Sequence, residues 1–324
     1  MGKLLLNPGP TNTRFRTKLA QWFGSDVCHR TGEFQKTLEE TKGLLLRGFE
    51  DHSIAIMAGS GTTAMEAMIC SLINKATVIN AGIYGQRAID MMDQYKIQYK
   101  EINCTSIDEL KRDTKVKNLY FVENETTTGE KFDVNKMAKL YPNANLFIDA
   151  TSAFGASDYS STNIAAMCFC SNKCLQSTPG LGIVIFDKKL LVANPGSYFL
   201  NLERYIGKDI PFTLPVQSVY ALNKTLKITK NNKKIFDERA SMLIKALGYL
   251  DIKCINKNPS NSIIGFVHPF LSYEKLRDKL LADNIVIYAG IKNIKNSFRI
   301  STMSSVFDSK FKKIIRVFYE SCIR

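Results

Sequence analysis

The chain has 324 residues, of which 45% are apolar and 23% are charged, as in an ordinary soluble globular protein. It contains no run of about 18 apolar residues, which excludes a membrane-spanning helix. The formal net charge is +14, but the lysines are spread along the chain and mixed with acids, as in 106–113 and 272–283. We therefore expect a solvated basic surface that helps to attract a small anionic substrate, and no nucleic-acid partner.

We do not expect a signal peptide, because the apolar part of the N-terminal stretch Met-Gly-Lys-Leu-Leu-Leu-Asn-Pro-Gly-Pro is too short and Pro8 interrupts it. We expect a cytoplasmic protein, and we expect its eight irregularly spaced cysteines to be reduced. Cys168, Cys170 and Cys174 stand close together, but Cys-x-Cys-x3-Cys is not a zinc pattern, and the three histidines are scattered. No metal site is predicted.

Short apolar runs alternate with longer amphipathic ones over the first 230 residues. This alternation predicts an α/β domain with a mostly parallel, seven-stranded sheet. The expected strands are 53–57, 76–80, 97–101, 117–122, 145–149, 166–170 and 182–186. The expected helices are 33–47, 62–74, 84–95, 133–140 and 214–229.

The pattern changes near residue 230, where the chain carries the charged run Lys-Asn-Asn-Lys-Lys. We expect a helix around 234–249 and then a strand at 261–267, a helix at 273–282, strands at 284–288 and 297–301, and a helix at 307–320. These elements predict a smaller α+β domain at 231–324 that follows a large domain at 13–230. Residues 1–12 are expected to pack near the active site.

The first candidate site is Ala58-Gly59-Ser60-Gly61-Thr62-Thr63-Ala64, which follows a predicted strand and opens an amphipathic helix. Glycines allow a tight turn, and free N–H groups at a helix N-terminus favour a phosphate. Ser60 and Thr62 add hydroxyl donors. A plain Ser/Thr helix cap is the alternative.

The same segment fits the Gly-x-Gly-x-x-Ala fingerprint of dinucleotide sites. Such a site needs an acid about 20 residues further on, at the end of the next strand. That strand ends Val78-Ile79-Asn80-Ala81-Gly82, without an acid. A nicotinamide-dependent oxidoreductase is therefore the less favoured interpretation.

The second candidate is Asp149, which ends an apolar strand and is followed by Ala150-Thr151. The carboxyl ends of strands are where α/β sheets bind ligands. A buried carboxylate needs a positive partner, and the protonated pyridine nitrogen of pyridoxal phosphate is one. An Asp that only caps the next turn is the alternative.

The third candidate is Lys173, in Ser171-Asn172-Lys173-Cys174 directly after the strand 166–170. A buried ammonium is costly, and formation of an imine with a cofactor removes that cost. Taken alone, an exposed turn lysine is the simpler interpretation.

The order of these features is a phosphate loop, an Asp about 90 residues later and a Lys about 24 residues after that. This order resembles fold-type I pyridoxal-phosphate enzymes and, within them, the class V aminotransferases, over nearly the whole chain. The resemblance is strongest to the branch that moves the amino group of 2-aminoethylphosphonate to pyruvate. The motifs that carry it are Leu4–Pro10, Asp26–Phe34, Asn80–Arg87, Glu125–Gly129, Ser171–Gln176, Phe212–Gln217 and Ser297–Ile300.

The resemblance implies pyridoxal 5′-phosphate as the cofactor and a homodimer with active sites at the subunit interface. Tyr84 would stack on the pyridine, Thr126 would bind its phenolic oxygen, and Asn172 would lie by the phosphate. Thr213 would reach the phosphate of the neighbouring subunit's cofactor, and Arg299 would hold the anionic group of the substrate. The expected cofactor contacts are Ser60, Gly61, Thr62, Tyr84, Thr126, Asp149, Thr151, Asn172, Lys173 and Thr213, with Lys173 and Asp149 as the catalytic pair.

The implied products are phosphonoacetaldehyde and alanine. Another donor and acceptor of class V, such as alanine or serine with glyoxylate, is the alternative. The segments 289–292 and 301–305 depart from the pattern of the 2-aminoethylphosphonate branch, and both stand near the expected substrate end of the site.

Overall fold

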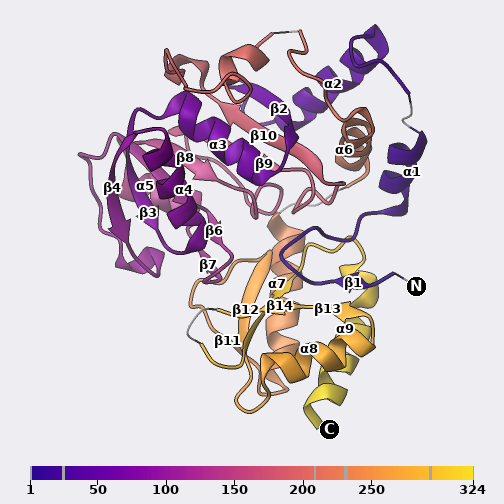
Figure 1. Cartoon of the computed structure of the whole chain (residues 1–324). Coiled ribbons are helices and arrows are strands. Elements are labelled where there is room, and N and C mark those ends of the chain that lie inside the picture. Colours follow the sequence, from indigo (N-terminus) through magenta and orange to yellow (C-terminus); the bar gives the residue numbers. More distant parts are fainter. Residues whose placement is uncertain (1, 24–25, 208, 230–232, 292–293, 324) are drawn as a thin grey trace.

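The computed structural model describes residues 2–23, 26–207, 209–229, 233–291 and 294–323 (Figure 1). A seven-stranded sheet with its helices forms the larger part of the molecule, and a smaller sheet with three helices lies beside it. The predicted domain boundary between residues 230 and 231 lies outside the described residues, so the division at that point stays a prediction.

The large sheet contains all seven predicted strands. They are β2 (Ser53–Gly59), β3 (Lys75–Asn80), β4 (Gln98–Asn103), β5 (Asn118–Val122), β8 (Asn145–Asp149), β9 (Ile164–Cys170) and β10 (Gly180–Phe186). They lie in the order β2-β10-β9-β8-β5-β3-β4. Only β10 runs antiparallel to its neighbours in this sheet. The predicted α/β class with a mostly parallel sheet is confirmed.

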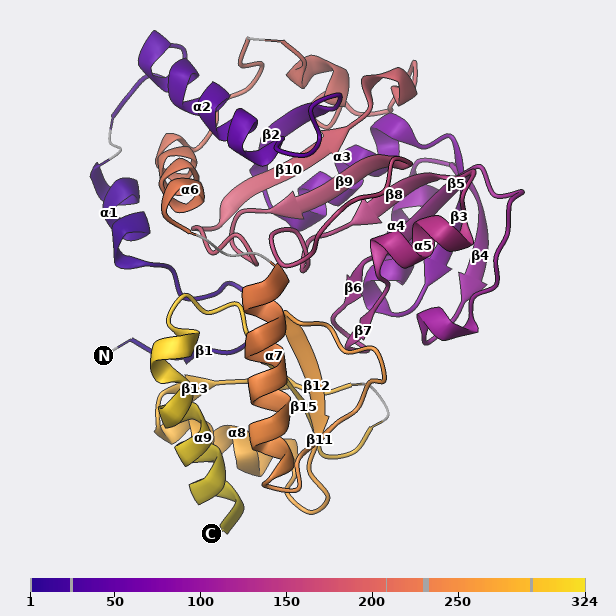
Figure 2. The ribbon, with the colours of Figure 1, turned by 180° about the vertical axis from the view of Figure 1, so that it is seen from behind.

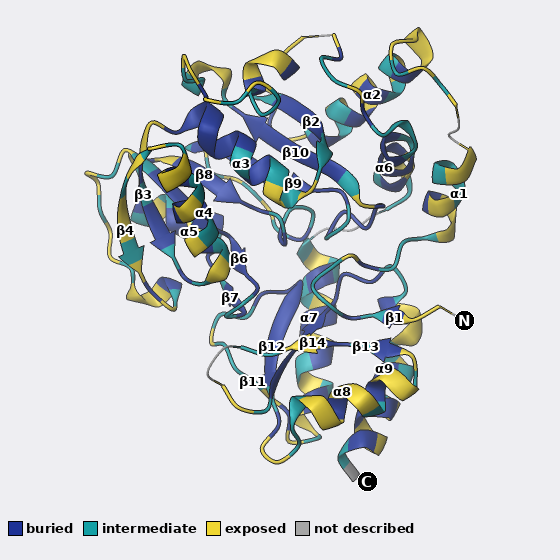
Figure 3. Ribbon diagram, in the orientation of Figure 1, coloured by how far each residue is buried: buried dark blue, intermediate teal, exposed yellow. Residues whose placement is uncertain are grey.

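Helices cover both faces of this sheet, which explains why its central strands are apolar at nearly every position. On one face lie α3 (Gly61–Leu72) and α4 (Ile83–Gln94), and on the other lie α2 (Gly32–Leu45), α5 (Val134–Leu140) and α6 (Val216–Ile228). Figure 3 shows β9 and β10 buried between these layers.

The smaller part has a four-stranded antiparallel sheet in the order β11 (Lys253–Cys254), β12 (Ile263–Val267), β15 (Ser297–Ser301) and β14 (Tyr288–Ala289). Its helices are α7 (Lys233–Gly248), α8 (Tyr273–Ala282) and α9 (Phe307–Ile323) (Figure 2). The single strand predicted at 284–288 is wrong. The chain forms two short strands there, because β13 (Ile285–Val286) pairs outside this sheet.

Several short elements have no counterpart in the prediction. They are β1 (Leu4–Leu5), helix α1 (Phe15–Phe23), the hairpin of β6 (Asn124–Glu125) and β7 (Glu130–Lys131), and the 3₁₀ turns Ile107–Glu109, Lys188–Leu190 and Leu202–Tyr205. Helix α1 buries only Thr17, so most of its apolar side chains are not part of the core.

Residues 4–12, which we call the N-terminal strap, join the two parts. Strand β1 pairs in parallel with β13, the amide of Ser301 donates to the carbonyl of Leu6 at 2.7 Å, and the amide of Ser305 donates to the carbonyl of Asn12 at 3.2 Å. The chain then enters α1, which packs on α6 of the larger part. The strap therefore crosses from the small sheet to the large one.

Within the described ranges, no helix is long and apolar enough to cross a membrane. Among the same residues, no group of three or more Cys, His, Asp and Glu side chains could hold a metal ion. All eight cysteines are free thiols.

Candidate active site

The candidate residues gather at one edge of the large sheet. Because β2, β8 and β9 run parallel, the residues that follow them, Ser60, Ala150 and Ser171, meet at the same carboxyl edge. This is the edge at which open α/β sheets bind ligands. The phosphate loop, Asp149 and Lys173 therefore share one region.

The phosphate loop is a capped helix start. Ser60 precedes α3, its Oγ accepts from the amide of Thr62 at 3.2 Å, and its own amide donates to Thr63 Oγ1 at 3.1 Å. A Cβ at Gly61 would lie 2.8 Å from Thr151 Cγ2, so only glycine allows this close approach. The Ser/Thr helix cap considered as the alternative is thus present. The N-terminal, positive end of α3 lies against Thr151.

Asp149 is 2% exposed, and its Oδ1 accepts from the amide of Thr151 at 2.9 Å. The turn cap considered above is therefore also present. Burial raises the pKa of the Asp149 carboxyl, against smaller lowering effects of the bonds from Thr151 and the charge of Lys173. A carboxyl with this environment binds a cation strongly when ionised, which suits a protonated pyridine nitrogen.

The burial of Asp149 predicts a pH-dependent stability difference in the cofactor-free protein. Above the ordinary Asp pKa of 3.8, the carboxyl ionises in the unfolded chain before it does so in the fold, because its folded pKa is raised. The free energy of unfolding of wild type therefore falls as pH rises from the ordinary pKa of 3.8 through the raised pKa of the folded protein. We expect Asp149→Asn to melt at a higher temperature than wild type at pH 7, and at the same temperature below the ordinary pKa. Calorimetry across pH measures this, and equal melting at pH 7 would refute it.

Lys173 is partly buried and lies against the N-terminal strap. Gly9 has φ +132°, and a Cβ there would lie 2.8 Å from Lys173 Cδ and 2.9 Å from Cε. The carbonyl of Lys173 accepts from the amide of Gln176, whose side-chain amide donates to the carbonyl of Met303 at 2.7 Å. An exposed turn lysine does not describe this environment. Asn172, the preceding residue, is partly buried as well.

Tyr84 lies in the first turn of α4, and Glu125 holds that turn. The Glu125 carboxylate is 0% exposed and accepts from the amides of Tyr84 at 3.0 Å, Gly85 at 3.3 Å and Thr127 at 3.1 Å. Burial raises the pKa of Glu125, and these hydrogen bonds oppose that rise. The carboxylate also complements the positive end of α4. No role was predicted for Glu125 from the sequence, although this residue begins the Glu125–Gly129 motif.

Arg299 is 7% exposed in the middle of β15. Its Nε donates to the carbonyl of Ala289 and its Nη1 to the carbonyl of Thr126, both at 2.6 Å. It thus links the small sheet to the residue expected to bind the cofactor, and Thr126 itself is buried. Burial lowers the pKa of Arg299.

A cavity of about 550 Å³ opens beside Arg299, within the size range of ligand sites. It is lined by Ile83, Thr127, Ser272, Tyr273, Glu274, Ala289, Gly290, Ile291, Ile294, Lys295, Asn296, Ser297 and Arg299. Part of the divergent segment 289–292 therefore contributes to its wall. Lys292 lies outside the described residues.

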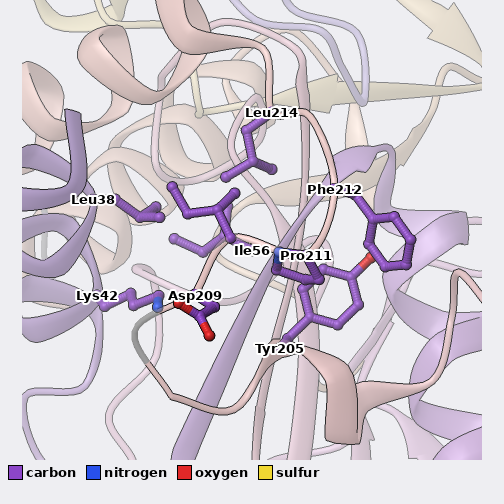
Figure 4. A pocket seen from close by; sticks show the side chains of 9 residues that line it. Leu38, Lys42, Ile56, Tyr205, Asp209, Pro211, Phe212 and Leu214 are labelled. Carbon is purple, nitrogen blue, oxygen red and sulfur yellow. The ribbon is translucent and has the colours of Figure 1, made fainter. Parts of the chain in front are cut away.

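Two features stand apart from this region. Thr213 is exposed in the loop before α6 and makes no hydrogen bond to the other candidate residues among those described. A second hollow, shown in Figure 4, lies among Leu38, Lys42, Ile56, Tyr205, Asp209, Ile210, Pro211, Phe212 and Leu214. Its volume of about 20 Å³ has room for little more than a water molecule, so it does not compete as a substrate site.

The family model described as aminotransferase class-V matches residues 89–316. The chain belongs to the class V aminotransferases. Two relatives of this aminotransferase are 2-aminoethylphosphonate–pyruvate transaminases of Bacillus cereus, strains ATCC 10987 / NRS 248 and ZK / E33L, with 27% and 29% identity. Each match covers 96% of this chain and 96% of the relative.

Solved structures show the same fold. An aspartate aminotransferase of subgroup IV from Thermus thermophilus superposes with a TM-score of 0.88 at 21% identity, covering 98% of each chain. An alanine–glyoxylate aminotransferase from Nostoc sp. reaches 0.86 at 20% identity, covering 100% of this chain and 96% of its own. The expected fold-type I architecture is confirmed.

The cofactor of this class V aminotransferase is pyridoxal phosphate. The residues at the carboxyl edge fit it, since the site offers a buried carboxyl with a raised pKa at Asp149, a partly buried amine at Lys173 and a helix N-terminus at Ser60. The family match decides against the nicotinamide interpretation of Gly59–Ala64.

Proposed function

We propose that this aminotransferase moves the amino group of 2-aminoethylphosphonate to pyruvate, giving phosphonoacetaldehyde and alanine. Support comes from the full-length similarity to relatives that carry this activity in their names. The structural observation that carries the proposal is the buried guanidinium of Arg299 beside a cavity of about 550 Å³. A guanidinium suits both the phosphonate of the donor and the carboxylate of the acceptor.

In this proposal, Lys173 and Asp149 divide the chemistry. When bound, pyridoxal phosphate supplies an electron sink for the carbanion at the amino-bearing carbon. Lys173 would hold the cofactor through its Nζ, and the same Nζ, once released, would take the proton from that carbon as a general base. The Asp149 carboxylate keeps the ring nitrogen protonated. Each half of the reaction releases a product before the next substrate binds, so the kinetics are ping-pong.

The remaining cofactor contacts are part of the same proposal. Ser60, Gly61 and Thr62 bind the phosphate at the start of α3, with Thr151 and Asn172 beside them. The ring of Tyr84 covers one face of the pyridine, and Thr126 binds the phenolic oxygen. The anchoring of Tyr84 by Glu125 and of Thr126 by Arg299 supports these positions.

We further propose a cytoplasmic homodimer in which Thr213 reaches the phosphate in the neighbouring subunit. The exposure of Thr213 supports this arrangement. So does helix α1, on which Phe15, Trp22 and Phe23 are 73%, 80% and 75% exposed, because large apolar surfaces are commonly covered by a partner. Light scattering behind a sizing column measures the mass, and a monomer at micromolar concentration would refute the dimer.

A panel of amino donors with pyruvate tests the substrate assignment. We expect transfer from 2-aminoethylphosphonate to pyruvate, measured as alanine formed, to be much faster than transfer from serine or other primary amines to pyruvate. It should also be much faster than transfer from alanine or serine to glyoxylate, measured as glycine formed. A visible absorption band that borohydride abolishes checks the cofactor separately. If alanine or serine with glyoxylate is faster, the alternative within class V replaces the proposed substrates and leaves the cofactor unchanged.

Arg299→Lys should weaken both substrates without releasing the cofactor. Lysine keeps the charge but loses the planar fork. Loss of one charge-assisted hydrogen bond costs roughly 1.5–3 kcal/mol, or about tenfold to a hundredfold in binding. The apparent Michaelis constants for 2-aminoethylphosphonate and pyruvate should therefore rise together in steady-state kinetics.

The control is Arg316→Lys, an exposed change in α9 where Arg316 faces Glu320. It should leave both constants unchanged. A rise for only one substrate would show that Arg299 is not a shared anchor. If neither constant changed, the aminoethylphosphonate assignment would lose its structural support.

A further inference from the structure

Arg87 lies one helical turn after Tyr84 on α4 and faces the phosphate loop. Its Nη1 is 3.3 Å from Thr62 Oγ1, and its Cζ is 4.8 Å from the centre of the Tyr84 ring. Helix α4 packs against α3, which Thr62 helps to begin. One partly buried side chain thus contacts two of the residues proposed to hold the cofactor.

The charge of Arg87 has no acidic partner in the part of the chain that the structure describes. Among the described residues, no carboxylate oxygen lies within 4.0 Å of its guanidinium. By contrast, the buried Arg239 pairs with Asp308 at 2.6 Å. An arginine that is partly buried without a carboxylate is suited to a bound anion nearby. The helix start at Ser60 and Thr62 is where our proposed function places the cofactor phosphate.

The hydrogen bond to Thr62 has only one possible direction. A guanidinium donates and never accepts, so Arg87 donates to Thr62 Oγ1. The hydroxyl proton of Thr62 must then point away from Arg87. The amide of Thr62 already donates to Ser60 Oγ. The hydroxyl is therefore left as a donor for a ligand at the helix start.

The contact with Tyr84 has a second effect. A guanidinium over the face of a tyrosine attracts the ring electrostatically and restricts its tilt. Glu125 holds the backbone of Tyr84 by accepting a hydrogen bond from its amide at 3.0 Å. Together they determine both the position of the helix start and the orientation of the ring.

We propose that Arg87 is a positioning residue for the cofactor, acting through the Thr62 hydroxyl and the Tyr84 ring and adding positive charge near the phosphate. This inference deepens the proposed function and rests on it.

The test uses the full chain with pyridoxal phosphate as the probe. Arg87→Met removes the charge and the donors but keeps the aliphatic stem, and Arg87→Lys keeps the charge without the planar fork. We expect Arg87→Met to raise the dissociation constant for pyridoxal phosphate by about tenfold or more, measured by equilibrium titration of the visible band. The ³¹P resonance of the bound phosphate should shift. Arg87→Lys should recover only part of the affinity.

A double-mutant cycle with Thr62→Val tests the route of the effect. If Arg87 acts through the Thr62 hydroxyl, Arg87→Met should have a smaller effect in the Thr62→Val background than in wild type. Arg204→Met is the matched control, because Arg204 lies 3.6 Å over the ring of Tyr198, away from the phosphate loop. It should leave cofactor binding unchanged.

The outcomes separate the inference from the function. A wild-type chain that binds no pyridoxal phosphate would overturn the proposed function. If wild type binds pyridoxal phosphate, and Arg87→Met has the same dissociation constant and the same ³¹P chemical shift as wild type, the inference alone is overturned. Strictly additive effects in the cycle would overturn the route through Thr62. If Arg87→Met does not fold, Arg87→Lys and Thr62→Val are compared with wild type by the same two measurements.

Discussion

Lys173→Ala should fold normally and lose nearly all turnover while it still binds pyridoxal phosphate noncovalently. The variant removes both the covalent anchor and the general base, and a general base alone contributes typically about 10²–10⁴-fold. The visible band of lysine-bound cofactor should disappear with the activity. Absorption spectra and single-turnover rates with 2-aminoethylphosphonate measure the two losses separately.

The control is Lys188→Ala. Lys188 is an exposed lysine that follows the neighbouring strand β10, but β10 runs antiparallel, so Lys188 lies at the opposite edge of the sheet. Its loss should change neither the spectrum nor the rate. Full activity in Lys173→Ala would rule out the mechanism proposed for this site.

Asp149→Asn should bind the cofactor and cut turnover by about 10²–10³-fold, the range typical for the loss of one preorganised electrostatic contact. A neutral amide cannot keep the pyridine nitrogen protonated. Asparagine keeps an oxygen that can accept from the Thr151 amide, so the turn itself is preserved. Pre-steady-state kinetics with each substrate should show the loss in both halves of the reaction.

Asp187 offers a close match for this experiment. Asp187 directly follows β10, and its Oδ1 accepts from the amide two residues later, Lys189, at 2.9 Å, as Asp149 does with Thr151. Asp187→Asn should leave turnover unchanged, because Asp187 lies at the opposite edge of the sheet from the candidate site. If Asp149→Asn were equally harmless with bound cofactor, Asp149 would serve only as a turn cap.

The large sheet was predictable because its strands are continuous apolar runs bounded by turn residues. Strands such as β9 are buried on both faces, so the hydrophobic signal is strong within a few residues of sequence. Strand β1 carries no such signal, and the apolar run at 284–288 does not reveal that β13 pairs with β1. Each has two residues and is stabilised by a partner at the other end of the chain.

The same contrast holds in the site. Asp149 and Lys173 were identifiable because Asp149 ends one buried strand and Lys173 lies three residues beyond another. Glu125 and Arg87 were not assigned roles, because each acts through a contact that the sequence does not show. Glu125 holds Tyr84, which is 41 residues away, and Arg87 contacts Thr62, which lies on another helix. The commitment of two Arg299 donors to carbonyl oxygens was likewise invisible, since it depends on how the two sheets meet.

The N-terminal strap also sets an order of events during synthesis. Leu4 leaves the ribosome about 280 residues before its pairing partner Ile285. At typical rates of about 5–20 residues per second, the strap waits roughly 15–55 s for β13. During that interval the large sheet can already form around Lys173, but Gly9 has no tethered strap to hold it against the lysine. The strap is therefore made well before it can reach its native contacts, and the wall beside Lys173 is completed only after β13 has left the ribosome.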